Sequence, residues 1–270
     1  MMSSSIKNYY SELLKSNKPF LISGPCVIES RDHCLFMAEN IKKICNELEI
    51  EYIFKASFDK ANRTKLKNFR GLNDIELSLD IFREIKTEIG IKVCTDVHET
   101  YQASLVGEII DIIQIPAFLC RQTDLLISAA KTGKIVNVKK GQFISGNDTD
   151  RITGKLKDSN NDLIFLTERG NNFGYDDYIV DFRNITIMKK NAPVIFDVGH
   201  SLQRGCAGGS SGSNMEFAEP LLRAALAVGV DGIFMEVHDN PPKALSDGTT
   251  SVRLSELKDL LKRNSDIWKK

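Results

Sequence analysis

The chain has 270 residues, of which 42% are hydrophobic and 27% charged, a composition typical of a soluble globular protein. Its 36 Lys and Arg residues balance 36 Asp and Glu residues, so it lacks the basic excess of proteins that bind nucleic acid or anionic membranes. We therefore predict neither nucleic acid nor a membrane as a partner, and any anion site must be local.

The N-terminal segment 1–18 has no apolar stretch followed by a small-residue cleavage site, so we do not interpret it as a secretory signal. We expect an N-terminal extension, in the form of a helix that packs against the lower end of the fold. No apolar run along the chain is long enough to span a bilayer. The 6 cysteines are scattered and form no CxxC motif, which indicates reduced thiols in a cytoplasmic protein.

Short apolar runs alternate with amphipathic stretches along the whole chain. The strand-like runs are, in order, 19–27, 51–58, 91–97, 109–116, 134–140, 162–170, 193–199 and 232–238. Apolar residues three and four apart predict helices within the intervening and following segments 31–49, 73–89, 122–132, 214–229 and 252–264. Residues 142–160 and 201–213 are polar and contain glycine, so we predict longer loops there.

Strands rich in Ile and Val that alternate with helices predict a parallel sheet covered by helices. Eight such repeats without an internal linker predict a single-domain α/β fold over residues 1–270, a closed (β/α)₈ TIM barrel. A doubly wound open sheet is the alternative. It is disfavoured because no glycine-rich dinucleotide turn follows the first strand.

Most of the apolar runs end in a chemically reactive side chain, and in a barrel all these ends meet at one rim, where active sites are built. The strand-end residues are Cys26, Lys55, Asp96, Lys139, Arg169, His200 and Glu236. The cations at this rim and in the following loops are Lys55, Lys60, Arg63, Arg121, Lys139 and Arg169. So many cations in a neutral chain predict an anionic small-molecule substrate with two phosphates, or with a phosphate and a carboxylate.

A second set of rim residues suits a metal ion. A thiol, an imidazole and two carboxylates are present in Cys26, His200, Glu236 and Asp247. Such a mixed set suits Zn²⁺, Fe²⁺, Co²⁺ or Mn²⁺, although spacing alone does not select this quartet. Three further candidates remain open as ligands: His98, Cys206 and His238. We interpret His33, in a helical stretch, as a surface residue. The loop GCAGGSSGS lacks the pattern of a nucleotide P-loop and is interpreted as a lid or phosphate-touching loop.

Several long strings resemble one enzyme family, the 3-deoxy-D-manno-octulosonate 8-phosphate synthases, within the phosphoenolpyruvate-dependent aldol-condensing synthases. The strings are GPC, KASFDKANRT, TDVHE, QIPAFLCRQTD, NVKKGQF, ERGNNFGYDD, FDVGHSLQ and MEVHDNPPKALSDG, in this order between about residue 19 and residue 262. The sister family that makes a seven-carbon sugar typically carries KPRT where this chain has KANRT. The resemblance therefore favours the eight-carbon product.

The resemblance implies condensation of phosphoenolpyruvate with D-arabinose 5-phosphate, for lipopolysaccharide of a Gram-negative type of envelope or for a plant cell wall. Carried over by position, the residues implied for phosphoenolpyruvate are Lys55, Ser57, Lys60, Ala117, Lys139 and Arg169. Those implied for the pentose phosphate are Asn62, Arg63, Ser211 and, from a neighbouring subunit, Arg121. Phe118 and Gln203 complete the expected substrate site, and Asp96, His200, Lys60 and Asn62 are the expected catalytic residues.

The resemblance also implies the metal-dependent class, because that class carries a cysteine after the first strand where the other class carries asparagine. Its ligands match Cys26, His200, Glu236 and Asp247. A homotetramer is expected. Three rivals remain: the seven-carbon synthase acting on erythrose 4-phosphate, a Schiff-base aldolase using Lys139, and a catalytically silent barrel that binds sugar phosphates.

Overall fold

The protein was analysed as a computed structural model, which describes residues 2–63, 65–172, 177–204 and 213–269. The strands are β1 Phe20–Gly24, β2 Tyr52–Lys55, β3 Lys92–Asp96, β4 Ile112–Ile115, β5 Ile135–Lys139, β6 Ile164–Glu168, β7 Val194–Asp197, β8 Gly232–His238 and β9 Val252–Arg253. The α-helices are α1 Met2–Lys15, α2 Arg31–Glu47, α3 Ile75–Glu84, α4 Thr100–Gly107, α5 Thr123–Lys131, α6 Thr149–Asp158, α7 Arg183–Met188, α8 Ala218–Val228 and α9 Leu254–Arg263. A π-helical segment, Ile85–Ile89, continues α3. Short 3₁₀ turns cover Ala117–Leu119, His200–Leu202, Met215–Phe217, Pro241–Lys243 and Gly248–Thr250.

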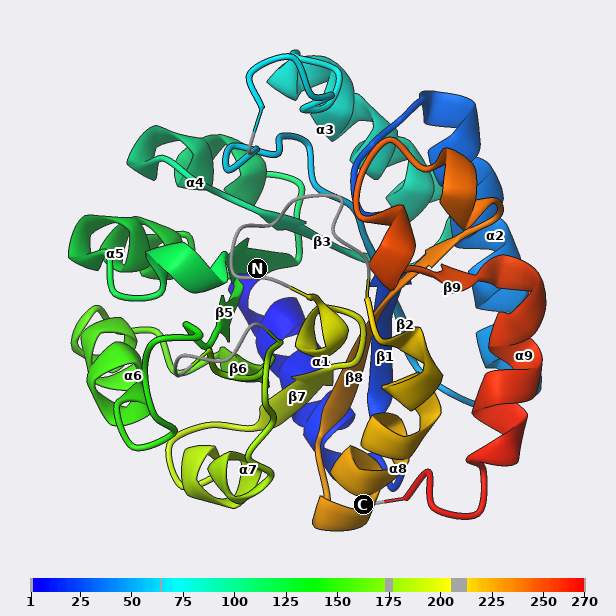
Figure 1. Ribbon diagram of the computed structural model, residues 1–270. Helices are drawn as coiled ribbons and strands as arrows, with labels where there is room; N and C mark the ends of the chain where they lie inside the picture. The colour runs from blue at the N-terminus through cyan, green and yellow to red at the C-terminus, as the bar shows by residue number, and fades with distance from the viewer. Residues whose placement is uncertain (1, 64, 173–176, 205–212, 270) are drawn as a thin grey trace.

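The strands β1 to β8 pair in sequence order, all parallel, and β1 also pairs with β8, which closes the sheet into a barrel. Phe20 lies opposite Gly232 and Gly24 opposite Glu236 in the closing pair. Figure 1 shows the helices as an outer ring around these strands. The prediction of a (β/α)₈ barrel is confirmed, and the open doubly wound sheet is excluded because a closed barrel leaves no edge strand.

The interior of the barrel is filled by apolar side chains, at least one from every barrel strand, and α1 closes its lower end. This inner cluster consists of Ile6, Leu13, Phe20, Ile22, Ile53, Cys94, Ile112, Ile135, Leu163, Phe165, Ile195 and Phe234. The Tyr10 hydroxyl donates to the Ile164 carbonyl at 2.9 Å, and the Tyr10 ring packs against Phe165 with centroids 5.0 Å apart. The expected helix at the barrel's lower end is therefore present, and Figure 1 shows it in blue behind the strands.

One element contradicts the predicted pattern. Residues 142–160 were expected to form a loop, yet α6 occupies Thr149–Asp158. Its buried face consists of Thr149, Ile152, Thr153 and Leu156. Because two of these four residues are threonines, the helical periodicity of apolar residues is weak in the sequence. A smaller difference is β9, which pairs with the end of β8 where we expected the first residues of a helix. No helix within the described ranges is long and apolar enough to cross a membrane.

Candidate active site

A cavity of about 300 Å³ opens at the carboxyl ends of the barrel strands, the size expected for small-molecule sites. The predicted site residues that line it are Lys55, Lys60, Asn62, Arg63, Asp96, Ala117, Phe118, Lys139, Arg169, His200, Gln203, Glu236 and Asp247. Residues separated by almost 200 positions in the chain therefore share one cavity, as the barrel geometry requires.

Three of the described predicted residues do not line this cavity. Ser57 is fully buried beneath it, where its hydroxyl accepts a hydrogen bond from Lys55 Nζ at 2.8 Å. Cys26 is also buried, against Ser246 and Asp247. Arg121 is exposed outside the cavity, and its proposed contact with a neighbouring subunit cannot be made within one chain. Ser211, like the ligand candidate Cys206, lies outside the described residues.

Gly24 directs the chain from β1 to Cys26. Its φ of +155° lies in a region that L side chains rarely adopt, and a Cβ there would come within 2.2 Å of the Lys55 carbonyl oxygen. The glycine thus lets β1 and β2 approach closely, so that the following Pro25 and Cys26 turn over the end of the barrel. This close approach explains the glycine of the GPC string.

Three of the four predicted metal ligands lie close together. Cys26 Sγ, a Glu236 carboxylate oxygen and an Asp247 carboxylate oxygen all lie within 4.8 Å of one another. The fourth, His200, places Nε2 3.7 Å from Glu236 Oε1. Asp197 lies 2.9 Å from His200 Nδ1 on the other side of the ring, which leaves Nε2 facing Glu236.

The chemistry of this group suits a divalent cation. Both Glu236 carboxylate oxygens are buried without a hydrogen-bond partner among the described residues, a costly arrangement that a cation would relieve. Burial raises the pKa of the Cys26 thiol well above its ordinary value, and Asp247 and Glu236 raise it further. The thiol accordingly donates to Asp247 Oδ2 at 3.0 Å, and a bound cation would take the place of that proton. The residues present therefore fit a divalent metal ion.

The Asp247 backbone adopts the left-handed region, with φ of 45°. Few residues other than glycine do so, although Asp tolerates it better than most. The Asp247 carbonyl accepts hydrogen bonds from the Thr250 and Ser251 hydroxyls, at 3.0 and 3.1 Å, which hold the turn. This turn presents the carboxylate to Cys26 and to Lys60 Nζ, 3.8 Å away.

The buried cations lie around the same cavity. Lys55 Nζ lies 3.5 Å from Asp96 Oδ1, and Lys139 Nζ makes a close ion pair with Asp197 and lies over the Phe234 ring. Burial lowers the pKa of Lys139 to about 8, with Asp197 opposing the shift.

Arg169 and Lys60 complete the cationic wall. The Arg169 guanidinium donates to Gln203 Oε1 at 2.6 Å, while its buried Nε has no hydrogen-bond partner in the described part of the chain. Burial lowers the pKa of Lys60, but the neighbouring acidic groups Cys26, Glu236 and Asp247 outweigh this and raise it. Lys60 is therefore a permanent cation and Arg169 retains a free donor, both suited to a phosphate or carboxylate.

Several residues of the cavity wall were not predicted from the sequence: Glu99, Gln114, Gln142, Tyr178, Asp197 and Phe234. Asp197 is the most consequential, because it is fully buried and joins Lys139 to His200. Its position at the carboxyl end of β7, equivalent to Asp96 at the end of β3, was the available signal. His98, a candidate ligand, instead pairs with Asp96, its Nε2 3.1 Å from Asp96 Oδ2.

Comparison with known proteins identifies first the family of the chain and then individual proteins similar to it. Residues 13–269 match the model of the DAHP synthetase I family, and the chain belongs to that family. It is 53% identical over 249 residues to the 2-dehydro-3-deoxyphosphooctonate aldolase of a Cyanothece sp., an alignment covering 91% of each chain. It is also 53% identical to the enzyme of that name from Koribacter versatilis, over 90% of this chain and 89% of the relative. The enzyme of that name from Fusobacterium nucleatum is 51% identical, over 92% of this chain and 90% of the relative.

Proposed function

We propose that this protein condenses phosphoenolpyruvate with D-arabinose 5-phosphate and water, giving 3-deoxy-D-manno-octulosonate 8-phosphate and inorganic phosphate, for lipopolysaccharide synthesis in the cytoplasm. The resemblance of the sequence motifs and the names of relatives about half identical over nine-tenths of the chain support this activity. The observation that carries it is the cavity itself, where Lys55, Lys60, Lys139 and Arg169 converge beside Cys26 and its carboxylate partners.

The cations account for the first requirement of the reaction, which is to bring together two phosphorylated substrates that repel each other. In our proposal Lys55, Lys60, Lys139 and Arg169 bind phosphoenolpyruvate, with Ser57 and the Ala117 backbone near its phosphate. Asn62, Arg63, Phe118, Gln203 and Ser211 face the pentose phosphate, with Arg121 of a neighbouring subunit in a homotetramer. Fixed positive groups in a buried site both neutralise and orient the substrates, so that C3 of the enol faces the aldehyde carbon.

Water must then add at C2, and the hemiketal phosphate must lose phosphate by C–O cleavage. Burial raises the pKa of Asp96, but Lys55 and His98 outweigh this and hold it well below its usual range. Asp96 is therefore an ionised group on the cavity wall that can accept a hydrogen bond from the attacking water and orient it. We assign Asp96 and His200 together to the proton transfer, with Asn62 nearby and Lys60 stabilising the developing charge.

A divalent metal ion held by Cys26, His200, Glu236 and Asp247 would supply Lewis acidity, polarising the aldehyde or acidifying the water. Asp197, behind this set, accepts a hydrogen bond from His200 Nδ1 and so orients the imidazole toward Glu236. The donor set does not choose between Zn²⁺, Fe²⁺, Mn²⁺ and Co²⁺.

The test is a phosphate-release assay with phosphoenolpyruvate and either D-arabinose 5-phosphate or erythrose 4-phosphate, each with and without a chelator. We expect release with the pentose phosphate, far less with the tetrose phosphate, and loss of activity in chelator that added metal restores. Preference for erythrose 4-phosphate would assign the seven-carbon reaction instead. Covalent trapping by borohydride on Lys139 would indicate a Schiff-base aldolase, and full activity in chelator would refute the metal-dependent assignment.

A further inference from the structure

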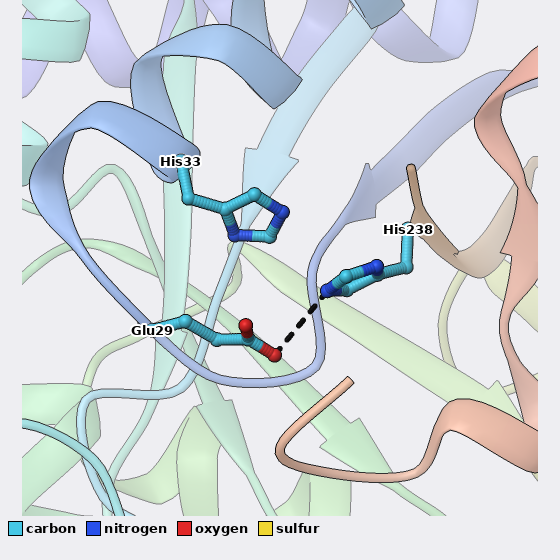
Figure 2. A group of neighbouring side chains, drawn as sticks. All are labelled: Glu29, His33 and His238. Atoms are coloured by element: carbon cyan, nitrogen blue, oxygen red, sulfur yellow. Dashed lines mark hydrogen bonds and ion pairs between the residues drawn. The ribbon is translucent and has the colours of Figure 1, made fainter. Parts of the chain in front are cut away.

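A second group of ligand-type side chains lies at the same end of the barrel but uses none of the Cys26 set. It consists of Glu29, which precedes α2, His33 in the first turn of α2, and His238 at the end of β8. One ligand atom from each lies within 4.8 Å of the other two. Figure 2 shows the three side chains converging from these two parts of the chain. His33 is therefore not the surface residue that the sequence suggested, since only 16% of its side chain is exposed.

The spacing of the donor atoms suits a small tetrahedral ion. Glu29 Oε1 and His238 Nε2 are 3.3 Å apart, close to the edge of about 3.4 Å between ligands of tetrahedral zinc. His33 Nδ1 is buried and has no hydrogen-bond partner among the described residues. Burial raises the pKa of Glu29, but hydrogen bonds from His238 and the Leu245 N–H outweigh this and lower it, so the carboxylate is ionised.

A neighbouring carboxylate lies beside the opposite nitrogens of both rings and is hydrogen-bonded to His33. Asp239 Oδ1 lies 3.0 Å from His33 Nε2 and 3.0 Å from His238 Nδ1. A carboxylate behind a histidine orients the ring and increases its basicity as a metal ligand. Nδ1 of His33 is then the nitrogen left for an ion, and Glu29 supplies an oxygen. In the metal-free ring His238 Nδ1 accepts the Asn240 N–H at 2.9 Å and Nε2 donates to Glu29, so an ion at Nε2 requires the ring proton to move to Nδ1, where Asp239 accepts it.

We propose that Glu29, His33 and His238 form a second divalent-metal site with two nitrogen ligands, one carboxylate oxygen and a fourth position for water. Such a set without sulfur suits Zn²⁺ or Co²⁺. The site joins the start of α2 to the loop after β8, because Glu29 Oε1 also accepts the Leu245 N–H at 2.8 Å. Leu245 lies two residues before Asp247, so an ion here stabilises the turn that carries a residue of the Cys26 site. The alternative, a network of ion pairs without metal, predicts no binding.

The test counts metal ions per chain by equilibrium dialysis of the full-length protein against Zn²⁺ alone, followed by elemental analysis. Wild-type protein is expected to hold two Zn²⁺ per chain and the His33→Leu and Glu29→Gln variants one. Glu29→Gln retains an oxygen for the Leu245 N–H and so separates metal binding from loop structure. Asp32→Asn is the matched control, since Asp32 pairs with Arg31 outside the group, and it should retain both ions. Circular dichroism confirms that each variant folds.

Substitution with Co²⁺ shows which site is lost, because only the Cys26 site gives a thiolate-to-metal charge-transfer band. His33→Leu should lose one ion and keep the band, whereas Cys26→Ala should lose the band and keep one ion. A wild-type content of one ion per chain, or two ions retained in both His33→Leu and Glu29→Gln, overturns the second site. A wild-type content of one ion per chain leaves the proposed activity intact. Failure of the proposed activity appears separately, as no phosphate release from phosphoenolpyruvate with D-arabinose 5-phosphate.

Discussion

Asp197 pairs with Lys139, which we propose binds phosphoenolpyruvate, and with His200, a candidate metal ligand. Replacing Asp197 with Asn therefore tests the proposed role of Lys139. Burial raises the pKa of Asp197, but His200 and Lys139 outweigh this and hold it far below its usual range, so the carboxylate is ionised. With Asp197 present the pKa of Lys139 is about 8, so Lys139 is charged below that pH and neutral above it. Without the carboxylate the same burial lowers the pKa of Lys139 further, and the cation is lost at a lower pH.

The size of the effect follows from the interaction removed. A hydrogen bond to a charged partner contributes about 1.5–3 kcal/mol, and about 1.4 kcal/mol corresponds to a factor of ten. The kcat/KM of Asp197→Asn for phosphoenolpyruvate should therefore fall by about 10- to 150-fold at neutral pH. Removing one partner of a buried ion pair also costs about 3–5 kcal/mol of folding stability. Asn retains an oxygen for the His200 ring, so the loss of folding stability should lie at the lower end of this range of about 3–5 kcal/mol.

The assay is the pH dependence of kcat/KM for phosphoenolpyruvate, together with urea unfolding. Wild-type activity should decline above about pH 8, and this decline should move to lower pH in Asp197→Asn. Glu168→Gln is the matched control, because Glu168 lies 3.4 Å from Lys140, both are fully buried and neither lines the cavity. It should lose stability while keeping the wild-type pH profile. An unchanged profile and kcat/KM in Asp197→Asn would refute the assigned role of Lys139.

Three further predictions concern other parts of the molecule. Cys26→Ala should lose the metal bound by its site, measured by metal analysis, and its kcat in the phosphate-release assay should fall by at least about 100-fold. Partial activity of Cys26→Asn in chelator would show that the metal mainly positions the substrates. Gly199→Ala should lower the free energy of unfolding in urea by about 1–3 kcal/mol, because its Cβ would lie 2.5 Å from the Thr250 carbonyl oxygen. Unchanged stability would show that the backbone of this loop can shift to accommodate the methyl group. Tyr10→Phe should cost about 1 kcal/mol without changing kcat, and an altered kcat would mean that the barrel's lower end influences the chemistry.

The sequence predicted the barrel because each buried strand forms an apolar run of six or so residues, and because parallel strands place their carboxyl ends together. The same reasoning placed Cys26, His200 and Glu236 near one rim, but the resemblance to a known family selected them with Asp247 as the ligand quartet. The structure brings Cys26, Glu236 and Asp247 within 4.8 Å, with His200 beside Glu236. Their role as ligands remains a prediction.

What could not be predicted depends on contacts across the fold. Helix α6 was hidden because threonines fill half of its buried face. The place of Asp197 at the end of β7 indicated a rim position, but its ion pair with Lys139 on a different strand depends on the folded barrel. His33 was assigned to the surface because local helical periodicity does not show that His238, 205 positions later, packs against it with ring centroids 4.6 Å apart.

The most direct test of the account is a crystal structure of the metal-loaded protein with phosphoenolpyruvate, recorded at the absorption edge of the bound metal. We expect a strong anomalous peak bounded by Cys26, His200, Glu236 and Asp247. We also expect the phosphate and carboxylate of the substrate to contact the lysines and arginine of the same cavity. A peak that avoids Cys26, or substrate bound away from these cations, would contradict the proposed site.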